Sequence, residues 1–539
     1  MTHGFDDQGA KFDPAGNLRN WWIDADLENF QARAKCIVDE YSEFPVVEGI
    51  NINGHRRPRR ATLAYRAYML RFGNVDSGGM AAALHMKYPL EPDANEMRRL
   101  IDEAARRVID HVESLPSQPA QNVEGATDFA RTLIEPLPRR GQAYETLLDF
   151  LFDEAIPRSF TAAGPGYLAY IPGGGIYHAA VADYIADAVN RYVGVCAAAP
   201  VLAQIEANVV RWFCEIVGYG KGSSGVLTTG GSLATLIAVI TAGRDAPPAP
   251  TLYCSDQIHH SFQKSASLAG FTTIREIPSD GEFRIRLDAL EAAIASDRAA
   301  GLNPFLAAGS AGTTATGAVD DLQALARIAR EHQMWFHVDG AYGAFFNLTE
   351  RGRERLRGME EADSIILDPH KTLFLPFGTG ALVMRDAAKL RRAHSMHADY
   401  LPAFQQEDEL VDFCELSPEL SRDFRGLRVW LPLKMFGIEP FREQLDEKLD
   451  LAAYAAAELR KTPGIEIVAE PQLSILAFRV EGDDEKNRDL LRRINARKRV
   501  MLTPATVGGR FVIRICIVSH RTHRGRVDMA LEDIRAEVS

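Results

Sequence analysis

Short apolar runs alternate with stretches of helical spacing along the middle of the chain. Such runs, with glycine or aspartate at their boundaries and helices between them, are typical of buried parallel strands in an α/β sheet. We therefore predict a large α/β domain with a mixed, mostly parallel sheet. Its expected strands are residues 251–254, 304–308, 335–338, 364–367 and 380–384.

The pattern differs on both sides of this region. Apolar residues between Met97 and Val112 recur at helical spacing, which predicts an amphipathic helix from about residue 94. Beyond residue 440 the pattern predicts a smaller α+β unit. That unit should contain a helix over 444–461 and strands near 474–480 and 511–518.

Changes in composition predict five segments. Residues 1–73 are polar, with one helical stretch near 24–41, and a passage bearing glycine, serine and proline follows them. The expected segments are an N-terminal extension (1–73), a linker (74–93), a helical segment (94–160), a large ligand-binding domain (161–435) and a small C-terminal domain (436–539).

Charge and cysteine content narrow the possible partners and compartment. The chain has 61 basic and 73 acidic residues, and its net charge of −12 argues against a nucleic-acid or anionic-membrane partner. Its six cysteines are scattered without CxxC spacing, which suits a reducing compartment. The polar N-terminus does not resemble a signal peptide, and no apolar run has transmembrane length. We expect a cytoplasmic protein.

A glycine-rich turn follows the apolar pair Val226-Leu227 and opens a predicted helix over 232–243. Ligands of α/β sheets collect beyond the carboxyl ends of the strands. Gly230 and Gly231 let the backbone approach an anion closely, and the helix N-terminus and the Ser232 hydroxyl offer donors. The turn therefore predicts a phosphate site, with a plain tight connection as the alternative.

Two ionisable residues follow later strands. Asp339 ends the run 335–338, and a buried carboxylate needs a cationic partner such as a protonated pyridine nitrogen. Lys371 comes shortly after the run 364–367, and a desolvated lysine can form a Schiff base with an aldehyde. Taken singly, each residue could be structural. Together with His259 and the phosphate turn, the ordered set predicts a pyridoxal-phosphate (PLP) site.

Residues from about 94 to 539 resemble the group II PLP-dependent decarboxylases, typified by aromatic L-amino-acid decarboxylase. The blocks Asp-Pro-His-Lys (368–371) and His-Val-Asp-Gly-Ala-Tyr (337–342) carry the resemblance, and residues 422–430 and 510–514 add to it. The resemblance implies the fold type I architecture of PLP enzymes. For the cofactor it implies Lys371 as the Schiff-base residue, Asp339 at the ring nitrogen, His259 and Ala341 on the two ring faces, Thr314 near the lysine, and Gly231, Ser232, Asp368 and His370 as further contacts.

Two further stretches would face the substrate if the resemblance holds. Tyr170, Pro172 and Gly173 match the family's substrate-side loop. Tyr400 matches a loop tyrosine that returns a proton to the substrate after CO₂ leaves, which favours plain decarboxylation over reaction with oxygen.

Small residues near these stretches change the expected pocket. Gly173 and Gly174 lie in the substrate-side loop, and Gly194 lies where the family commonly has a bulkier side chain. We therefore expect a roomier pocket than in the typical family member.

Residues 3–73 resemble the C-terminal catalytic part of neprilysin-family zinc peptidases. His3 matches the second histidine of that family's zinc motif, whereas the first histidine and the catalytic glutamate would precede Met1. The distal glutamate ligand should lie between Gly54 and Tyr65, where the chain is basic. The resemblance implies a peptidase remnant without a metal site.

The resemblance implies a homodimer in which both subunits build each active site. We predict a PLP enzyme that decarboxylates an L-amino acid, aromatic or bulky and apolar, to the amine and CO₂. The alternatives are another fold type I lyase that cleaves a carbon–carbon bond and a decarboxylase of acidic amino acids. A non-catalytic scaffold and a zinc peptidase are rivals from other classes.

Overall fold

The computed structural model describes residues 90–171, 173–396 and 410–538. The chain divides into two units, Met1–Ala104 and Ala105–Ser539. The first unit is described from residue 90 only, so the predicted helical stretch near 24–41 lies outside the described residues. In the described part of the chain, no helix is both long enough and apolar enough to cross a membrane.

A seven-stranded sheet forms the centre of the second unit, in the order β1-β7-β6-β5-β4-β2-β3. All five predicted runs are confirmed as strands, and the mixed, mostly parallel sheet is confirmed as well. The strands are β1 (Ser224–Thr228), β2 (Pro250–Ser255), β3 (Thr273–Ile277), β4 (Asn303–Ser310), β5 (Trp335–Asp339), β6 (Ser364–Leu367) and β7 (Gly380–Met384).

One strand direction differs from the prediction. β7 runs antiparallel to both β1 and β6, although its apolar run suggested a parallel strand. A parallel connection needs a long crossover, usually a helix that packs on the sheet. Between β6 and β7 the chain forms only the one-turn helix α14 (Pro369–Thr372), so β7 returns alongside β6.

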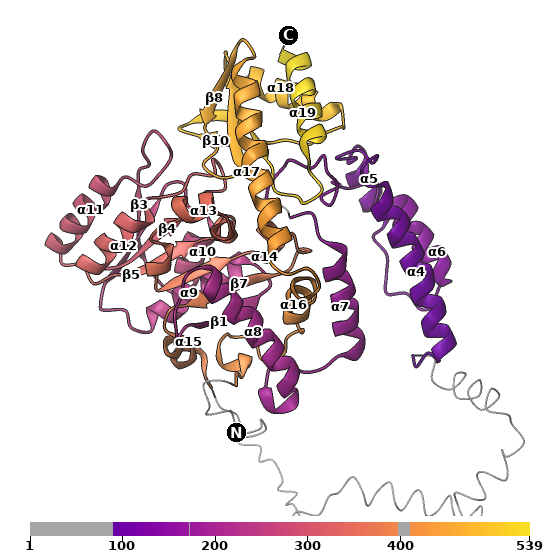
Figure 1. The fold of residues 1–539 in the computed structure, drawn as a ribbon, viewed down its shortest axis with the longest axis horizontal. Coiled ribbons are helices and arrows are strands. Elements are labelled where there is room, and N and C mark those ends of the chain that lie inside the picture. Colours follow the sequence, from indigo (N-terminus) through magenta and orange to yellow (C-terminus); the bar gives the residue numbers. More distant parts are fainter. Residues whose placement is uncertain (1–89, 172, 397–409, 539) are drawn as a thin grey trace, which may run out of the picture. The chain divides into compact units, whose positions relative to one another are not determined.

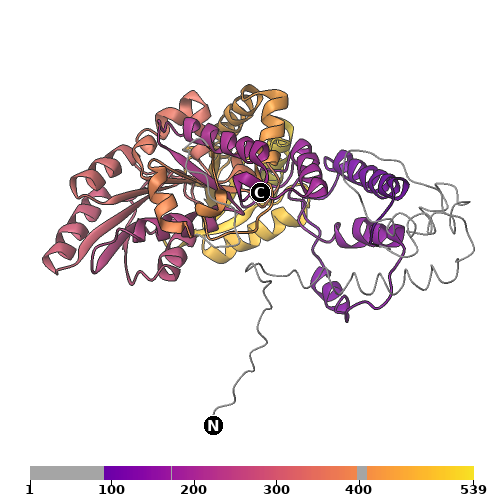
Figure 2. The same cartoon turned by 90° about the horizontal axis from the view of Figure 1, so that it is seen from below.

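Helices lie on both faces of this sheet, as the view in Figure 2 shows. In α12 (Leu322–Glu331) the residues Leu322, Leu325 and Ile328 are buried at helical spacing, and the Asp321 carboxylate caps the helix by accepting from the Ala324 N–H. The other helices of this region are α7 (Tyr177–Val189), α8 (Pro200–Ile216), α9 (Gly231–Gly243), α10 (Ser261–Leu268), α11 (Leu287–Ala299), α13 (Glu350–Arg355), α15 (Ala387–His394), α16 (Gly426–Phe436) and the short 3₁₀ turns 196–198, 344–348, 359–361 and 413–415.

A second, antiparallel sheet lies near the C-terminus, in the order β10-β11-β9-β8 (orange to yellow in Figure 1). The predicted helix and two strands are confirmed as α17, β9 and β11, whereas β8 and β10 were not foreseen. The elements are α17 (Glu439–Arg460), β8 (Ile465–Ala469), β9 (Ile475–Val480), α18 (Asp484–Ala496), β10 (Thr503–Val507), β11 (Arg510–Cys516) and α19 (Arg524–Val538).

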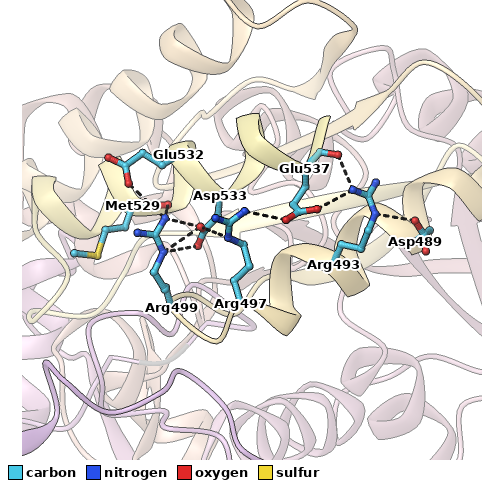
Figure 3. A network of polar contacts seen from close by, with 8 residues as sticks. All are labelled: Asp489, Arg493, Arg497, Arg499, Met529, Glu532, Asp533 and Glu537. Atoms are coloured by element: carbon cyan, nitrogen blue, oxygen red, sulfur yellow. Dashed lines mark hydrogen bonds and ion pairs between the residues drawn. The ribbon is translucent and has the colours of Figure 1, made fainter. Parts of the chain in front are cut away.

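An ion-pair network fastens the last two helices of this small unit (Figure 3). The Asp533 carboxylate is fully buried and pairs with Arg497 and Arg499, which follow α18. Arg493 and Arg497 both reach Glu537, one turn further along α19. A buried carboxylate is tolerated when it is paired in this way. The network therefore fixes α19 against the end of α18.

The predicted helix near residue 94 is confirmed as α4 (Ala94–Ser114). This helix is described over its whole length and has no buried residue, and the side chains of Met97 and Ile109 are each about half exposed. The following elements are α5 (Ala126–Thr132), α6 (Tyr144–Asp149) and the π-helical turn Phe150–Ala155.

Candidate active site

A cavity of about 330 Å³ lies beyond the carboxyl ends of β1, β4, β5 and β6. This edge of an α/β sheet is the usual place for a ligand, and the volume lies in the range of small-molecule sites. The structure brings every described residue predicted for the cofactor to this one cavity. They are Gly231, Ser232, His259, Thr314, Asp339, Ala341, Asp368, His370 and Lys371.

The start of α9 forms one end of the cavity. Gly231 is the first residue of this helix and Ser232 the second, so backbone N–H groups of the first turn point toward the cavity end. A Cβ atom at Gly231 would lie 2.9 Å from Asp368 Oδ2 and 3.3 Å from Ala341 Cβ. A side chain at position 231 would therefore crowd Asp368 and Ala341, and glycine keeps the start of α9 accessible to a ligand.

A buried ion pair holds the strand that leads to this turn. The Arg422 and Glu206 side chains pair at 2.5 Å, and neither is exposed to solvent. Arg422 and Arg425 both donate to the Leu227 carbonyl at the end of β1, and Glu206 accepts from the Gly426 N–H. The block 422–430, which resembles the decarboxylase family, therefore holds the end of β1 in place, next to the glycine turn at the proposed phosphate site.

Asp339 ends β5, beside Ser310 of β4 in the sheet register. Its carboxylate accepts one hydrogen bond, from the Ala341 N–H at 3.2 Å. Burial raises the pKa of the Asp339 carboxyl, and the nearby Lys371 lowers it in part. A carboxylate in this position is stabilised by a cationic ligand group.

Lys371 lies in α14, where one helical turn brings it to the same face as Asp368. The Lys371 Nζ and Asp368 Oδ2 atoms are 2.9 Å apart. The other Asp368 oxygen, Oδ1, is buried and has no hydrogen-bond partner among the residues that the structure describes. The amine therefore lies beside a carboxylate rather than in an apolar setting, and both groups open into the cavity.

Two histidines lie on the cavity wall with fixed ring orientations. His259 Nδ1 lies 2.7 Å from the Ser261 hydroxyl oxygen and 3.3 Å from the Ser261 backbone nitrogen, and these contacts hold the ring. Burial, followed by the adjacent His260, lowers the pKa of His259 to about 4, and the ring is neutral at physiological pH. His370 Nδ1 donates to the Thr379 carbonyl at 2.5 Å. The flat, neutral His259 ring suits stacking on an aromatic ligand.

Tyr170 and Gly173, the described residues predicted for the substrate side, do not line this cavity. Tyr170 is 55% exposed, and Gly173 lies behind the lysine turn, where its N–H donates to the His370 carbonyl. Pro172 and Tyr400 lie outside the described residues.

The expected extra room in the pocket is not present at the three glycines. A Cβ atom at Gly173 would lie 2.3 Å from the Lys371 carbonyl oxygen, and one at Gly174 would lie 2.3 Å from Ser519 Oγ. At Gly194 it would lie 2.8 Å from the Tyr192 ring. Neighbouring backbone and side-chain atoms of this chain occupy the space next to these glycines, so the space is not part of a larger pocket.

Arg514 was not predicted as a functional residue. It lies in β11, 4% exposed, and donates to the Ala315 carbonyl and to the Thr503 hydroxyl. Its Nη2 atom is buried without a hydrogen-bond partner in the described part of the chain. Burial lowers the pKa of this guanidinium. Ala315 directly follows the cavity residue Thr314, so an unpaired cation lies close to the site. A charged residue within an apolar strand was the available sequence signal.

The site fits PLP. The Gly231 cradle can receive the phosphate, the Asp339 carboxylate a protonated ring nitrogen, and the Lys371 amine the aldehyde. The sheet order, the small C-terminal sheet and a lysine at a strand end together define a PLP enzyme of fold type I.

Comparisons with known proteins agree with this class. The family model described as "Pyridoxal-dependent decarboxylase conserved domain" matches residues 137–481. An aromatic-L-amino-acid decarboxylase from Bacillus atrophaeus is 34% identical over 453 residues, which cover 81% of this chain and 94% of that protein. The corresponding enzyme of Sus scrofa is 29% identical, over 82% of this chain and 96% of its own length.

A solved structure shows the same fold. The Oryza sativa structure titled as TDC with PLP and tryptamine has a TM-score of 0.78 and 25% identity, over 83% of this chain and 98% of that one. The chain belongs to the pyridoxal-dependent decarboxylase family, and it is a PLP-dependent carboxy-lyase that acts on an amino acid.

The N-terminal resemblance also has support. The model of Peptidase family M13 matches residues 1–63, which lie outside the described residues.

Proposed function

We propose that the chain releases CO₂ from an aromatic or other bulky, apolar L-amino acid and leaves the corresponding amine. The convergence of Asp339 and Lys371 on one cavity carries the proposal. The substrate class is supported by relatives named aromatic-L-amino-acid decarboxylase and tryptophan decarboxylase, the latter 25% identical over 83% of this chain.

Each group at the cavity has a proposed task in this reaction. PLP, when bound, supplies an electron-withdrawing ring that accepts the electrons left behind by CO₂. The Asp339 carboxylate holds a proton on the ring nitrogen, and the neutral His259 ring and Ala341 keep the ring plane fixed from its two faces. The α9 N-terminus and Ser232 bind the phosphate, with Thr314, Asp368 and His370 as further cofactor contacts.

Lys371 and Tyr400 have the two remaining tasks. The Lys371 amine, which lies beside Asp368 in the cavity, would hold the cofactor through its aldehyde group. The Tyr400 hydroxyl delivers a proton to the substrate α-carbon after CO₂ has left. Tyr170, Pro172 and Gly173 are proposed to face the substrate beside the cofactor cavity rather than in its wall, since the Gly173 N–H bonds the His370 carbonyl next to Lys371. They belong to a proposed ligand-binding domain of residues 161–435.

Arg514 favours a second candidate, an acidic substrate. A guanidinium with a free donor is the expected partner of a carboxylate, and Arg514 provides a buried one close to the cavity. It can receive the carboxylate that all amino acids share, or a side-chain carboxylate. If Arg514 binds the shared carboxylate, apolar amino acids react; if it binds a side-chain carboxylate, acidic amino acids react.

A CO₂-release screen over all proteinogenic amino acids, with added PLP, tests the proposal. We expect release from tryptophan, tyrosine, phenylalanine or another bulky apolar residue, at a kcat/KM at least about 100-fold above that for aspartate and glutamate. The reverse preference would establish the acidic substrate class. Release from none of them, with consumption of substrate by another reaction, would contradict decarboxylation.

We also propose that two copies of the chain form a dimer with shared active sites. Tyr177, Val181, Tyr184, Ile185 and Val189 form an exposed apolar stripe along α7, and Tyr184 is 53% exposed. Such a stripe is typical of an interface between copies. The Phe377 ring is 66% exposed, and its centroid lies 5.8 Å from that of the cavity residue His370. Arg428 bonds both Asp183 of α7 and the carbonyl of Gly378, the neighbour of Phe377, so a second copy on the α7 stripe would border the active site.

The substitution Tyr184→Asp tests the dimer, because it places a charge in the apolar stripe. We expect sedimentation analysis to show a dimer for the native chain. For the variant, the dissociation constant of the dimer should rise about 100-fold or more, so that monomer predominates. Leu268→Asp is the control, since Leu268 is an exposed leucine on α10. A native chain that sediments as a monomer would refute the proposal.

The five cysteines of the described part are all free, which supports the proposed cytoplasmic location.

A further inference from the structure

The segment that follows β11 contacts two parts of the site region at once. Residues Ser519–Thr522, which we call the C-terminal clamp, lie against the stretch 163–175. The Thr522 hydroxyl donates to the Pro165 carbonyl at 2.8 Å, and His520 Nδ1 donates to the Gly173 carbonyl at 3.2 Å. The small C-terminal unit therefore reaches the glycine stretch that precedes α7.

Arg521 makes most of the hydrogen bonds between the clamp and this stretch. Its guanidinium donates to the carbonyls of Ala163, Gly174 and Gly175, the shortest of these bonds being 2.5 Å to Gly174. Among the residues that the structure describes, no carboxylate pairs with Arg521, and burial lowers the pKa of this guanidinium. Gly174 and Gly175 both have positive φ, a conformation that other residues rarely adopt, and both of their carbonyls accept from Arg521. A partly desolvated cation thus depends on the conformation of this stretch.

The same stretch bonds directly to the lysine turn. The Gly173 N–H donates to the His370 carbonyl at 3.1 Å, and the Ile176 N–H donates to the Phe374 carbonyl at 2.7 Å. Phe374 has the positive φ of 61°, which is costly for a bulky residue and persists only when its surroundings hold it. The His520 ring lies 5.9 Å from the Phe374 ring, between centroids. The clamp therefore holds both the glycine stretch and the turn that carries Lys371.

We propose that the C-terminal clamp, through Arg521 and His520, is a positioning device that fixes the 173–176 stretch against the backbone of the Lys371 turn and so sets the affinity for the amino-acid substrate. The proposal deepens the proposed function and rests on it for the identity of the bound substrate. Arg521 and His520 act through the backbone and do not line the cavity.

The charge-removing substitution Arg521→Gln in the holoenzyme tests the clamp, with Arg526→Gln as the matched control. Arg526 also donates only to backbone carbonyls, those of Arg499 and Pro116, and burial lowers its pKa as well. Hydrogen–deuterium exchange of the Gly173 and Ile176 amides reports on the clamp without any substrate. We expect exchange about 10-fold or more faster in Arg521→Gln and unchanged in Arg526→Gln.

The second readout is the split between KM and kcat for the amino acid that reacts best in the CO₂ screen. We expect Arg521→Gln to raise KM about 10-fold or more with kcat within about 3-fold, while the melting temperature and the PLP dissociation constant match those of Arg526→Gln. His520→Asn, which keeps a donor near the Nδ1 position, should preserve KM, whereas His520→Ala should raise it.

Several results would overturn the clamp. Equal amide exchange in Arg521→Gln and Arg526→Gln would do so, as would faster exchange with an unchanged KM. A parallel loss of kcat, PLP binding and melting temperature would mean a purely structural role. If Arg521→Gln does not fold, Arg521→Lys is measured by the same criteria. A native enzyme that releases no CO₂ but shows the exchange difference would refute the proposed function and the assigned effect on affinity, yet leave the contact itself established.

Discussion

Replacing Lys371 by alanine is expected to reduce CO₂ release at least about 10⁴-fold, to the background of PLP in solution. The Lys371 amine is a described cavity group placed to bond the cofactor aldehyde, beside Asp368 at 2.9 Å. Without it, the cofactor has no covalent anchor, and the substrate amine has no group to displace. The visible absorbance band of the bound cofactor should shift to that of the free aldehyde.

Chemical labelling separates this role from a general loss of structure. Borohydride reduction of the native holoenzyme, followed by peptide mapping, should place the cofactor on residue 371. Lys264→Ala is the control, because Lys264 is an exposed lysine on α10, close in sequence to His259. It should retain the absorbance band, the labelled peptide and full activity. Labelling at any other lysine would refute the assignment of Lys371.

The part of the site that the sequence predicted depends on local signals. β5 and β6 are short apolar runs that end in Asp339 and in the turn carrying Lys371, so pattern and chemistry adjoin in the chain. The glycine turn before α9 is local in the same way. Since parallel strands bring their carboxyl ends to one edge, three local signals were enough to predict one cavity.

The elements that were missed lack such a signal. β3 is half exposed, and β10 has exposed residues and contains Pro504, which an edge strand tolerates. The direction of β7 depends on the length and structure of the connection from β6. The apolar run of β7 itself does not indicate that direction. Periodicity predicts that a strand exists better than it predicts how the strand pairs.

Contacts between distant segments were beyond a single sequence. Arg521 and Gly174 are 347 positions apart, and nothing near either residue indicates the other. The glycines at 173 and 174 suggested a larger pocket because the sequence shows that a side chain is missing there. It does not show which distant segments pack against these positions. The structure shows that backbone atoms of the lysine turn and the Ser519 hydroxyl occupy that space.

Asp339→Asn is expected to lower kcat on the order of 10²–10³-fold while PLP still binds. The substitution keeps the shape of the side chain and the hydrogen bond from the Ala341 N–H but removes the negative charge. A neutral amide does not raise the pKa of the ring nitrogen, so the ring withdraws electrons less strongly. The loss should therefore appear in kcat rather than in KM or in the amount of bound cofactor.

A cofactor analogue with a permanently cationic, N-methylated ring provides the decisive comparison. If Asp339 acts by keeping the ring nitrogen cationic, this analogue should restore a large part of the activity of Asp339→Asn and should not improve the native enzyme. Asp320→Asn is the control, because Asp320 is a buried carboxyl that accepts from the Ile285 and Ser310 N–H groups rather than from a ligand. Any loss in that variant should resist rescue. If the analogue fails to rescue Asp339→Asn although it binds normally, the carboxylate holds the ring in position rather than tuning its charge.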